Sequence, residues 1–228
     1  MRFPETLVMG ATGRIGRLLQ RHWCPAEVGD QLLWQGRTPV GLDRMAPQVI
    51  VQPLTQPGQL TQAATGRQIL CLAGAVPGRG RLADNWPLAA AALRAAAPGQ
   101  RVILCSSAAV YGAQTGTLKE TTMLRPVTDY GLAKLEMEQR SIALAAELGV
   151  SLCLLRIGNI AGLDACLGGW RPGFQLDQFT DGSTPARSYI GVTTLAQLLA
   201  ELLAQPQLPP VLNLAQPGLV EMGTLLTA

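Results

Sequence analysis

Short, wholly apolar segments alternate with helical segments along most of the chain, and this alternation restricts the fold more than any other feature. The strand-like segments cover residues 6–9, 31–34, 49–51, 68–73, 101–105 and 150–155. Helical segments are expected between them, at residues 14–21, 59–64, 84–97 and 128–148. A strand that is apolar on both faces must be covered on both faces, as in a parallel sheet between two helix layers. The sequence therefore predicts an α/β fold with a doubly wound parallel sheet, the Rossmann fold.

The regular alternation ends near Ile160, and a different organisation is expected beyond it. Residues 163–186 are rich in Gly and Pro, which predicts irregular structure. A short strand at 188–190, a helix at 194–203 and a last strand at 211–214 are expected to follow.

This change in pattern divides the chain into two parts of unequal size. We expect a dinucleotide-binding domain over residues 1–158 and a small, irregular, C-terminal substrate-binding region over residues 159–228. The second part is expected to pack on the first, and its final strand to return to the sheet. A chain of 228 residues is long enough for one such core and short for two.

Composition narrows the functional classes. Hydrophobic residues make up 48% of the chain and charged residues 14%, as in a well-packed globular protein. The longest apolar run, 69–76, is far shorter than the roughly 20 residues of a membrane span, and the first residues lead directly into a strand without a signal-peptide layout. We therefore expect a cytoplasmic protein with no membrane partner. The net charge of +3 is spread without a basic run, which favours a small anionic ligand over nucleic acid.

Cysteine and histidine usage argues against metal chemistry. The five cysteines are odd in number and form no C-x-x-C pair, and several lie in apolar strands, where a free thiol behaves as a small hydrophobe. The single histidine, His22, leaves little for a His-based metal site or a Ser-His-Asp triad. No metal site is predicted.

A glycine-rich loop, GATGRIG, joins the first strand to the first helix. One glycine of such a loop supplies a tight turn, a second admits a pyrophosphate to the backbone, and a third lets the helix pack on the strand. The helix N-terminus then offers free N–H groups to the phosphates. A purely structural turn is the alternative, but the position between first strand and first helix favours dinucleotide binding. The expected cofactor contacts are Gly10, Thr12, Gly13, Arg14, Ile15 and Gly16.

The end of the second strand bears on the choice of dinucleotide. An NAD-selective site usually has an acid there to accept from the ribose 2′-hydroxyl, and the segment Trp34-Gln35-Gly36-Arg37-Thr38 has none. Arg37 could instead pair with a 2′-phosphate. NADP is therefore favoured over NAD, and a solvated arginine in a turn is the other interpretation of Arg37.

A serine, a tyrosine and a lysine supply the candidate chemistry. Tyr130 and Lys134 are four residues apart in the 128–148 helix, so both project from one face. Ser107 follows the 101–105 strand, at a carboxyl end where parallel sheets form ligand crevices. A phenol has a pKa of about 10, and a nearby ammonium group lowers that pKa. We expect Tyr130 to exchange the proton during hydride transfer while Ser107 holds the substrate oxygen; a chance helical pair is the structural alternative.

These segments together resemble the extended short-chain dehydrogenase/reductase family, the NAD(P)-dependent sugar epimerase/dehydratase group. The resemblance is carried, in order, by GATGRIG at 10–16, LAG at 72–74, Asn85, SSAAVYG at 106–112, YGLAK at 130–134, RIGNIAG at 156–162 and ARSYIGVTTLAQLL at 186–199. It implies catalytic roles for Ser107, Tyr130 and Lys134, with Lys134 also bonding the nicotinamide ribose.

The same resemblance implies further contacts. Cofactor contacts are expected at Ser106, Tyr130 and Lys134 as well as at Ala73, Gly74, Ile157 and Asn159. Substrate contacts are expected at Ser107, Asn159 and Arg187. Arg187 falls where relatives that use nucleotide sugars often place a phosphate-binding arginine, and a plain loop cation is the other interpretation.

The chain also departs from this family. Ala108 and Ala109 stand where 4,6-dehydratases carry an acid and a base, which disfavours water elimination, and Gln52 stands where an Asp is common near the adenine. The chain ends at Ala228, so a shortened C-terminal substrate region is expected. The leading interpretation is an NAD(P)-dependent epimerase or reductase acting on a sugar-like or other hydroxyl or carbonyl substrate. The alternative is a cofactor-binding regulatory or scaffold protein that has lost catalysis.

An interaction with a second copy of the chain is the last expectation. The helices at 84–97 and 128–148 are rich in alanine, which permits close approach of helices, and relatives often pair through this bundle. A homodimer could form there with Ala89–Ala92 in the contact. Burial of these alanines against the chain's own sheet would give the same composition.

Overall fold

The computed structural model describes residues 3–23, 29–39, 47–164, 172–173 and 175–227. Cys24 and Cys166, two of the five cysteines, lie outside these ranges. Cys71, Cys105 and Cys153 are free thiols. Within the described part, no helix has both the length and the apolar character that crossing a bilayer requires.

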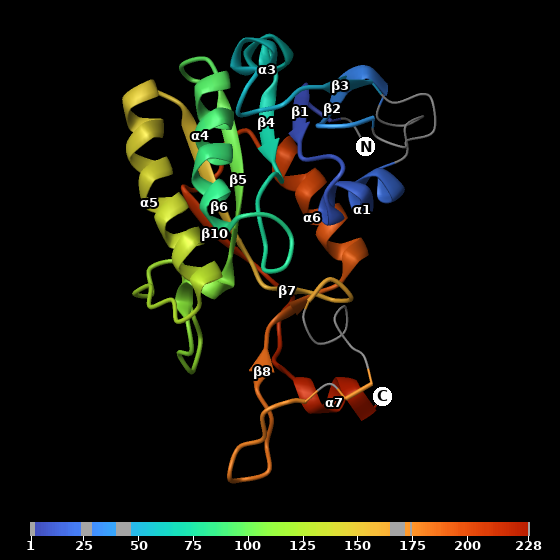
Figure 1. Cartoon of the computed structure of the whole chain (residues 1–228), viewed down its shortest axis with the longest axis vertical. Coiled ribbons are helices and arrows are strands. Elements are labelled where there is room, and N and C mark those ends of the chain that lie inside the picture. The colour runs from blue at the N-terminus through green and yellow to red at the C-terminus, as the bar shows by residue number, and fades with distance from the viewer. Residues whose placement is uncertain (1–2, 24–28, 40–46, 165–171, 174, 228) are drawn as a thin grey trace.

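Seven strands form one parallel sheet, ordered β10-β6-β5-β4-β1-β2-β3 (Figure 1). The strands are β1 (Thr6–Met9), β2 (Leu32–Gly36), β3 (Gln48–Ile50), β4 (Gln68–Cys71), β5 (Arg101–Ser107), β6 (Ser151–Ile157) and β10 (Val211–Leu214). The order reverses direction between β1 and β4, as in a doubly wound sheet. The predicted Rossmann fold is confirmed, and β10 lies at the edge of the sheet beside β6.

Helices cover both faces of this sheet, and each face has its own hydrophobic core. The helices α1 (Arg14–His22) and α6 (Val192–Ala204) lie on one face, and α3 (Pro57–Ala64), α4 (Asn85–Ala95) and α5 (Asp129–Leu148) on the other (Figure 1). Successive residues of β1 alternate between the cores: Val8 packs in the first, while Leu7 and Met9 pack in the second. This is why strands that look uniformly apolar in sequence are buried on both sides.

The ends of α5 are set by local chemistry, and this matters because α5 carries two of the candidate catalytic residues. The Thr128 hydroxyl caps the helix by accepting a hydrogen bond from the Gly131 N–H at 3.1 Å. At the other end Gly149 adopts the left-handed conformation, with φ of 63°, which favours glycine. Tyr130 is therefore fixed in the first turn of the helix.

The remaining elements form a small lobe beyond the carboxyl ends of the strands (Figure 1). Here β7 (Asn159–Ile160) pairs with β9 (Tyr189–Ile190) in parallel, and β8 (Ala186–Arg187) pairs with β11 (Val220–Glu221) in antiparallel. The lobe ends with helix α7 (Met222–Thr227). Three short 3-10 segments, η1 (Gly29–Gln31), η2 (Leu82–Asp84) and η3 (Ala108–Tyr111), complete the described elements.

The structure decides between the two interpretations of the alanine-rich helix α4. Ala89, Ala90 and Ala92 are almost fully buried in the chain's own core, against the sheet and α5. These three alanines are therefore not available as the contact surface of a homodimer. On α5 the large exposed apolar side chains are Leu132 and Ile142, and pairing through this helix layer stays a prediction.

Candidate cofactor and active site

The carboxyl ends of β1, β4, β5 and β6 bring most of the predicted site residues to one edge of the sheet. The glycine loop follows β1, Ala73 and Gly74 follow β4, and Ser107 is the last residue of β5. The N-terminal turn of α5, with Tyr130, lies beside the 3-10 segment that follows β5.

Two of the three loop glycines are required by packing. Gly10 has φ of +83°, and a Cβ there would lie 2.7 Å from the backbone nitrogen of Ala73. A Cβ on Gly16 would lie 2.5 Å from the carbonyl oxygen of Ala11. Gly10 therefore makes the turn against β4, and Gly16 lets α1 pack on the loop.

Gly13 differs from the other two glycines. Its φ of −72° and ψ of 173° are extended backbone that any residue adopts, and an added Cβ would meet only the Gly10 carbonyl, at 3.1 Å. Gly13 is also the N-cap of α1, with no side chain capping the first turn. No side chain therefore caps the N–H groups of that first turn or blocks the path to them, as binding of a phosphate requires. This arrangement fits a dinucleotide pyrophosphate.

Gln35 supports the loop from the neighbouring strand β2. Its side-chain oxygen accepts from the Gly10 N–H at 3.0 Å, its backbone carbonyl accepts from the Ala11 N–H at 2.9 Å, and its amide donates to the Val51 carbonyl at 2.6 Å. A buried glutamine that satisfies three partners in this way holds the loop without offering a group to the ligand.

Arg14, the first residue of α1, connects the glycine loop to the segment after β7. Its Nη1 donates to the Leu163 carbonyl at 2.6 Å. The side chain is exposed. It thus spans from the phosphate end of the candidate cofactor site to the C-terminal lobe.

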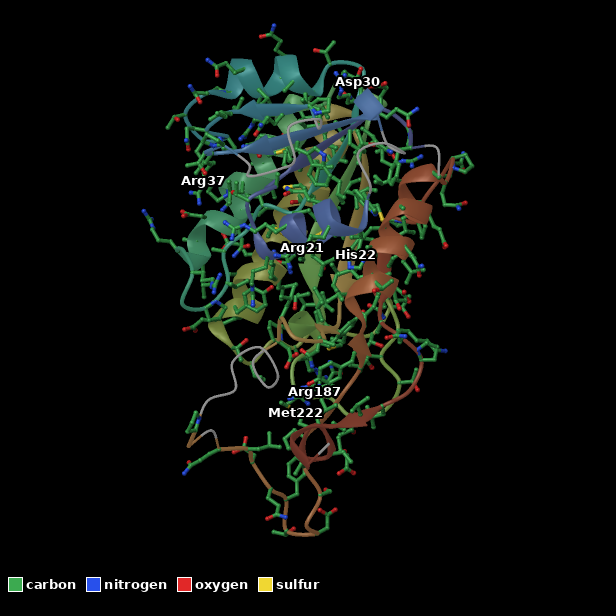
Figure 2. The ribbon with its side chains drawn as sticks, turned by 90° about the vertical axis from the view of Figure 1, so that its right-hand side faces the viewer. Arg21, His22, Asp30, Arg37, Arg187 and Met222 are labelled. Atoms are coloured by element: carbon green, nitrogen blue, oxygen red, sulfur yellow. The ribbon has the colours of Figure 1, made fainter. Side chains whose placement is uncertain are left out.

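Arg37 lies where the sequence places it, just beyond the end of β2. Its side chain is exposed (Figure 2), and no ion pair within the described part of the chain includes it. The Gln52 side chain contacts the backbone of Arg37, where Gln52 Nε2 donates to the Arg37 carbonyl at 2.9 Å. The Arg37 guanidinium is thus compatible with a 2′-phosphate.

Gly74 is the point where β4 meets the lysine of α5. A Cβ on Gly74 would lie 3.3 Å from the Lys134 Nζ and 2.9 Å from the Asn85 side-chain oxygen. The buried Asn85 side chain holds this segment by bonding the N–H and the carbonyl of Ala75, at 3.2 and 3.1 Å. Gly74 and Lys134, separate in sequence, are thereby adjacent in space.

Ser107 lies close enough to Tyr130 that the interaction between their side chains lowers the pKa of Tyr130 in part. The Ser107 hydroxyl also accepts from the Ala109 N–H at 3.2 Å, which starts the 3-10 segment η3. The two predicted catalytic residues are therefore neighbours in space.

The expected lowering of the Tyr130 pKa by Lys134 is not what the structure gives. Burial dominates and raises the pKa of Tyr130, while the Ser107 hydrogen bond and the positive charge of Arg14 lower it in part. The Lys134 Nζ lies 6.0 Å from the centre of the Tyr130 ring. Its nearest acceptor is the carbonyl of Cys105, at 2.9 Å. Arg14, which the sequence analysis placed only in the phosphate loop, is the cation whose charge lowers the pKa of Tyr130 in part.

Lys134 is buried, with 5% of its surface exposed. Burial lowers the pKa of Lys134, because desolvation disfavours the ammonium form. The carbonyl of Cys105 satisfies one of its donors. A buried lysine with donors still to satisfy, next to Gly74 and Tyr130, could bond a ribose hydroxyl.

The side chain of Ser106 faces away from this group. It is buried and donates to the Glu138 carboxylate at 2.5 Å, and Glu138 in turn pairs with Arg156 at 2.7 Å. Sequence reasoning assigned no role to Glu138 or Arg156. The signal was present, since an arginine inside a strand that is otherwise apolar needs an acidic partner when it is buried. A contact of Ser106 with the cofactor stays a prediction.

The substrate-side residues lie at the start of the C-terminal lobe. Ile157 ends β6, and Asn159 in β7 is paired with Tyr189 of β9. A Cβ on the intervening Gly158 would lie 2.9 Å from the Ser188 carbonyl, so this crossing is close-packed. Arg187 is exposed on β8 beside Met222 of α7, well separated from Arg37 (Figure 2). Within the described residues, no three His, Cys, Asp or Glu side chains are grouped as a metal site would need.

Comparison with known proteins supports the resemblance. Residues 79–166 match the model of the NAD dependent epimerase/dehydratase family. A UDP-glucose 4-epimerase from Azospirillum brasilense is 33% identical over 142 residues, which are 52% of this chain and 40% of that protein. The chain thus spans 40% of the length of the curated relative that it matches. Part of the chain, residues 79–166, is thus similar to the NAD dependent epimerase/dehydratase family, in agreement with the resemblance stated from the sequence.

Solved structures agree at the level of the fold. MoeE5, in complex with UDP-glucose and NAD, has a TM-score of 0.76 at 21% identity, covering 98% of this chain and 80% of that one. The UDP-glucuronic acid 4-epimerase from Bacillus cereus, in complex with UDP-glucuronic acid and NAD, has a TM-score of 0.76 at 19% identity, covering 100% of this chain and 81% of that one.

The loop glycines provide a matched pair of variants. We expect Gly13→Val to remain folded, because its backbone is extended and an added Cβ would meet only the Gly10 carbonyl, and to lose dinucleotide binding, because the side chain enters the phosphate approach. Gly16→Ala should instead fail to fold stably, because its Cβ meets backbone atoms of Ala11. Circular dichroism and calorimetric titration with NADH and NADPH measure both. A folded Gly13→Val that binds as the parent does would contradict the assignment.

Proposed function

We propose that this protein is an NAD(P)-dependent epimerase or reductase that acts on a hydroxyl or carbonyl group of a sugar-like substrate. The observation that carries the proposal is the grouping of Ser107, Tyr130 and buried Lys134 at the carboxyl end of β5, with Gly74 beside the Lys134 Nζ. The glycine loop, which has no capping side chain at Gly13, supplies the matching place for a dinucleotide.

In this proposal Tyr130 is the acid and base. A bound nicotinamide ring accepts or supplies the hydride, and Tyr130 moves the accompanying proton of the substrate hydroxyl. Ser107 holds the substrate oxygen next to the phenol. Lys134 bonds the nicotinamide ribose from its buried position beside Gly74.

The raised pKa of Tyr130 bears on the direction in which the proposed reaction runs. At neutral pH the phenol holds its proton, so Tyr130 is ready as an acid for reduction of a carbonyl. Oxidation of an alcohol needs the phenolate, which the positive charge of Arg14 and the Ser107 hydrogen bond favour. The charge of an oxidised nicotinamide adds to this effect. An epimerase needs both directions within one turnover, whereas a reductase needs only the first.

Arg37 supports NADP as the cofactor, and the relatives support NAD. The exposed guanidinium at the end of β2 suits a 2′-phosphate, with no acidic residue in this segment to bind a 2′-hydroxyl. The structural relatives named above were solved with NAD. We propose NADP and take NAD as the alternative.

A nucleotide sugar is the substrate class that the relatives suggest. MoeE5 and the Bacillus cereus enzyme bind UDP-sugars, and Arg187 is exposed on β8 at the lobe beyond the strand ends. We propose that Arg187 binds a substrate phosphate and that Asn159 borders the substrate. Ala108 and Ala109, which lack an ionisable group, disfavour water elimination.

The first prediction from this proposal concerns Tyr130. Tyr130→Phe removes the exchangeable proton and keeps the ring, so turnover should fall by about 10²–10⁴-fold, while dinucleotide affinity hardly changes. Lys134→Met should lose turnover and also some dinucleotide affinity. Steady-state assays with a panel of UDP-sugars, aldehydes and ketones, together with dinucleotide titrations, measure both. Near-normal turnover by Tyr130→Phe would show that the assignment is wrong.

A second prediction concerns pH. Arg14 lowers the pKa of Tyr130, so Arg14→Gln should raise that pKa. The rate of alcohol oxidation, which needs the phenolate, should then rise at a higher pH than in the parent. Arg17→Gln, one turn along the same exposed helix face, is the matched control and should leave the profile in place. An unmoved profile for Arg14→Gln would remove Arg14 from this role.

A third prediction concerns the choice of cofactor. Loss of a charged hydrogen bond costs roughly 1.5–3 kcal/mol, so Arg37→Ala should weaken NADPH about ten- to hundredfold and NADH little. Calorimetric titration of both dinucleotides on one preparation checks this. Equal small changes for the two would leave Arg37 as a solvated turn residue.

A further inference from the structure

A buried polar network lies behind the candidate catalytic residues, on the α4/α5 side of the sheet. Its centre is the Glu138 carboxylate, which accepts from Ser106 at 2.5 Å and from the Arg156 guanidinium at 2.7, 3.1 and 3.2 Å. The exposed fractions are 1% for Glu138, 5% for Ser106 and 6% for Arg156. Ser106 and Arg156 are register partners on β5 and β6, so the carboxylate of α5 joins two adjacent strands.

The network continues from Arg156 into the segment between β5 and α5. Arg156 Nη1 donates to the Tyr111 hydroxyl at 3.0 Å and to the Glu120 carbonyl at 3.0 Å. The Tyr111 hydroxyl donates to the Asn213 side chain on β10 at 2.6 Å. The Asn213 backbone N–H in turn donates to the Glu120 carboxylate at 2.8 Å. The segment of chain between Ser107 and Tyr130 is thus hydrogen-bonded to both β6 and β10.

Stability alone is a poor reason for a charged pair in this place. Moving a carboxylate and a guanidinium out of water is costly, and buried ion pairs can often be replaced by apolar side chains without loss of stability. Burial alone would lower the pKa of Arg156, but the hydrogen bonds and charge of Glu138 and Tyr111 hold that pKa above its ordinary value. What the pair does provide is a fixed orientation of α5 on the sheet, because the Glu138 carboxylate accepts hydrogen bonds from both β5 and β6.

The position of Glu138 connects this orientation to the candidate catalytic residues. Glu138 follows Lys134 by one helical turn on the same buried face of α5. Ser106 directly precedes Ser107 on β5. A shift of α5 along β5 would therefore break the Glu138 contacts and separate Ser107 from Tyr130 together.

We propose that Glu138 is a positioning residue that, through Ser106 and Arg156, fixes α5 against the ends of β5 and β6 and thereby sets the spacing between Ser107 and the Tyr130–Lys134 pair. The inference rests on the proposed function for its catalytic meaning. Its geometric content, the position of α5 against the ends of β5 and β6, is measurable without a substrate.

The test compares Glu138→Gln with Arg101→Gln. Arg101 makes a clamp of similar kind at the opposite end of β5, donating to the carbonyls of Gln205 and Pro206 at 2.7 and 2.5 Å. Both variants should melt at a lower temperature than the parent. Only Glu138→Gln should lower kcat, by about 10²-fold if the reacting groups are displaced.

A second readout follows the phenol itself. The chain has three tyrosines, so 3-fluorotyrosine labelling gives three fluorine resonances, which Tyr→Phe variants assign. Loss of the Ser107 contact should move the titration of position 130 to higher pH in Glu138→Gln and not in Arg101→Gln. Should Glu138→Gln not fold, the double variant Glu138→Met with Arg156→Met keeps the volume without charges and is expected to show the same two changes.

The outcomes separate the two proposals. An unchanged kcat and an unchanged fluorine titration in a folded Glu138 variant would overturn the positioning role and leave the network purely structural. A displaced titration combined with normal turnover by Tyr130→Phe would support the positioning role and contradict the proposed function.

Discussion

The packing of α5 against the carboxyl ends of β5 and β6 is the interaction on which the candidate site depends. Ser107 belongs to a strand and Tyr130 to a helix, and more than twenty residues of chain lie between them. Hydrogen bonds of the sheet fix the strand ends, and the Thr128 cap fixes the helix start. What remains free is the position of the helix on the sheet, and the Glu138 network together with the apolar core below it removes that freedom.

The glycine loop shows the same division between packing and binding. At Gly10 and Gly16, backbone atoms occupy the space that a side chain would need, so the packing of the fold itself requires glycine at both positions. Gly13 has extended backbone, and an added Cβ would meet only the Gly10 carbonyl, so the fold requires glycine there less strictly. A sequence pattern shows three equivalent glycines, whereas the structure separates two positions required by packing from a third that is proposed to bind the dinucleotide.

The sequence predicted the doubly wound parallel sheet and named Ser107, Tyr130 and Lys134, because the sheet follows from periodicity and the helical pair from spacing, with the resemblance supporting the group. Apolar runs of four to seven residues determine which segments enter a parallel sheet, and the i,i+4 spacing determines which helical residues share a face. Helix α7 and the β8–β11 pair were not predicted, because two-residue strands carry too little pattern to be recognised. The Tyr130 pKa was expected in the wrong direction, because a sequence shows a neighbouring lysine but not the burial that opposes it.

The groups around Lys134 on the α5 side of the sheet determine how far its charge is compensated. Glu138, the acid one turn away, is committed to Arg156. The thiols of Cys71 and Cys105 also lie near Lys134, but burial raises their pKa values to about 11 and about 12, so both stay neutral at physiological pH. Within the described residues, no anion therefore neutralises Lys134 through an ion pair. Burial lowers the pKa of Lys134 and the charge of Glu138 opposes that shift only in part. The Lys134 Nζ itself lies beside Gly74, where a dinucleotide following the glycine loop is proposed to lie.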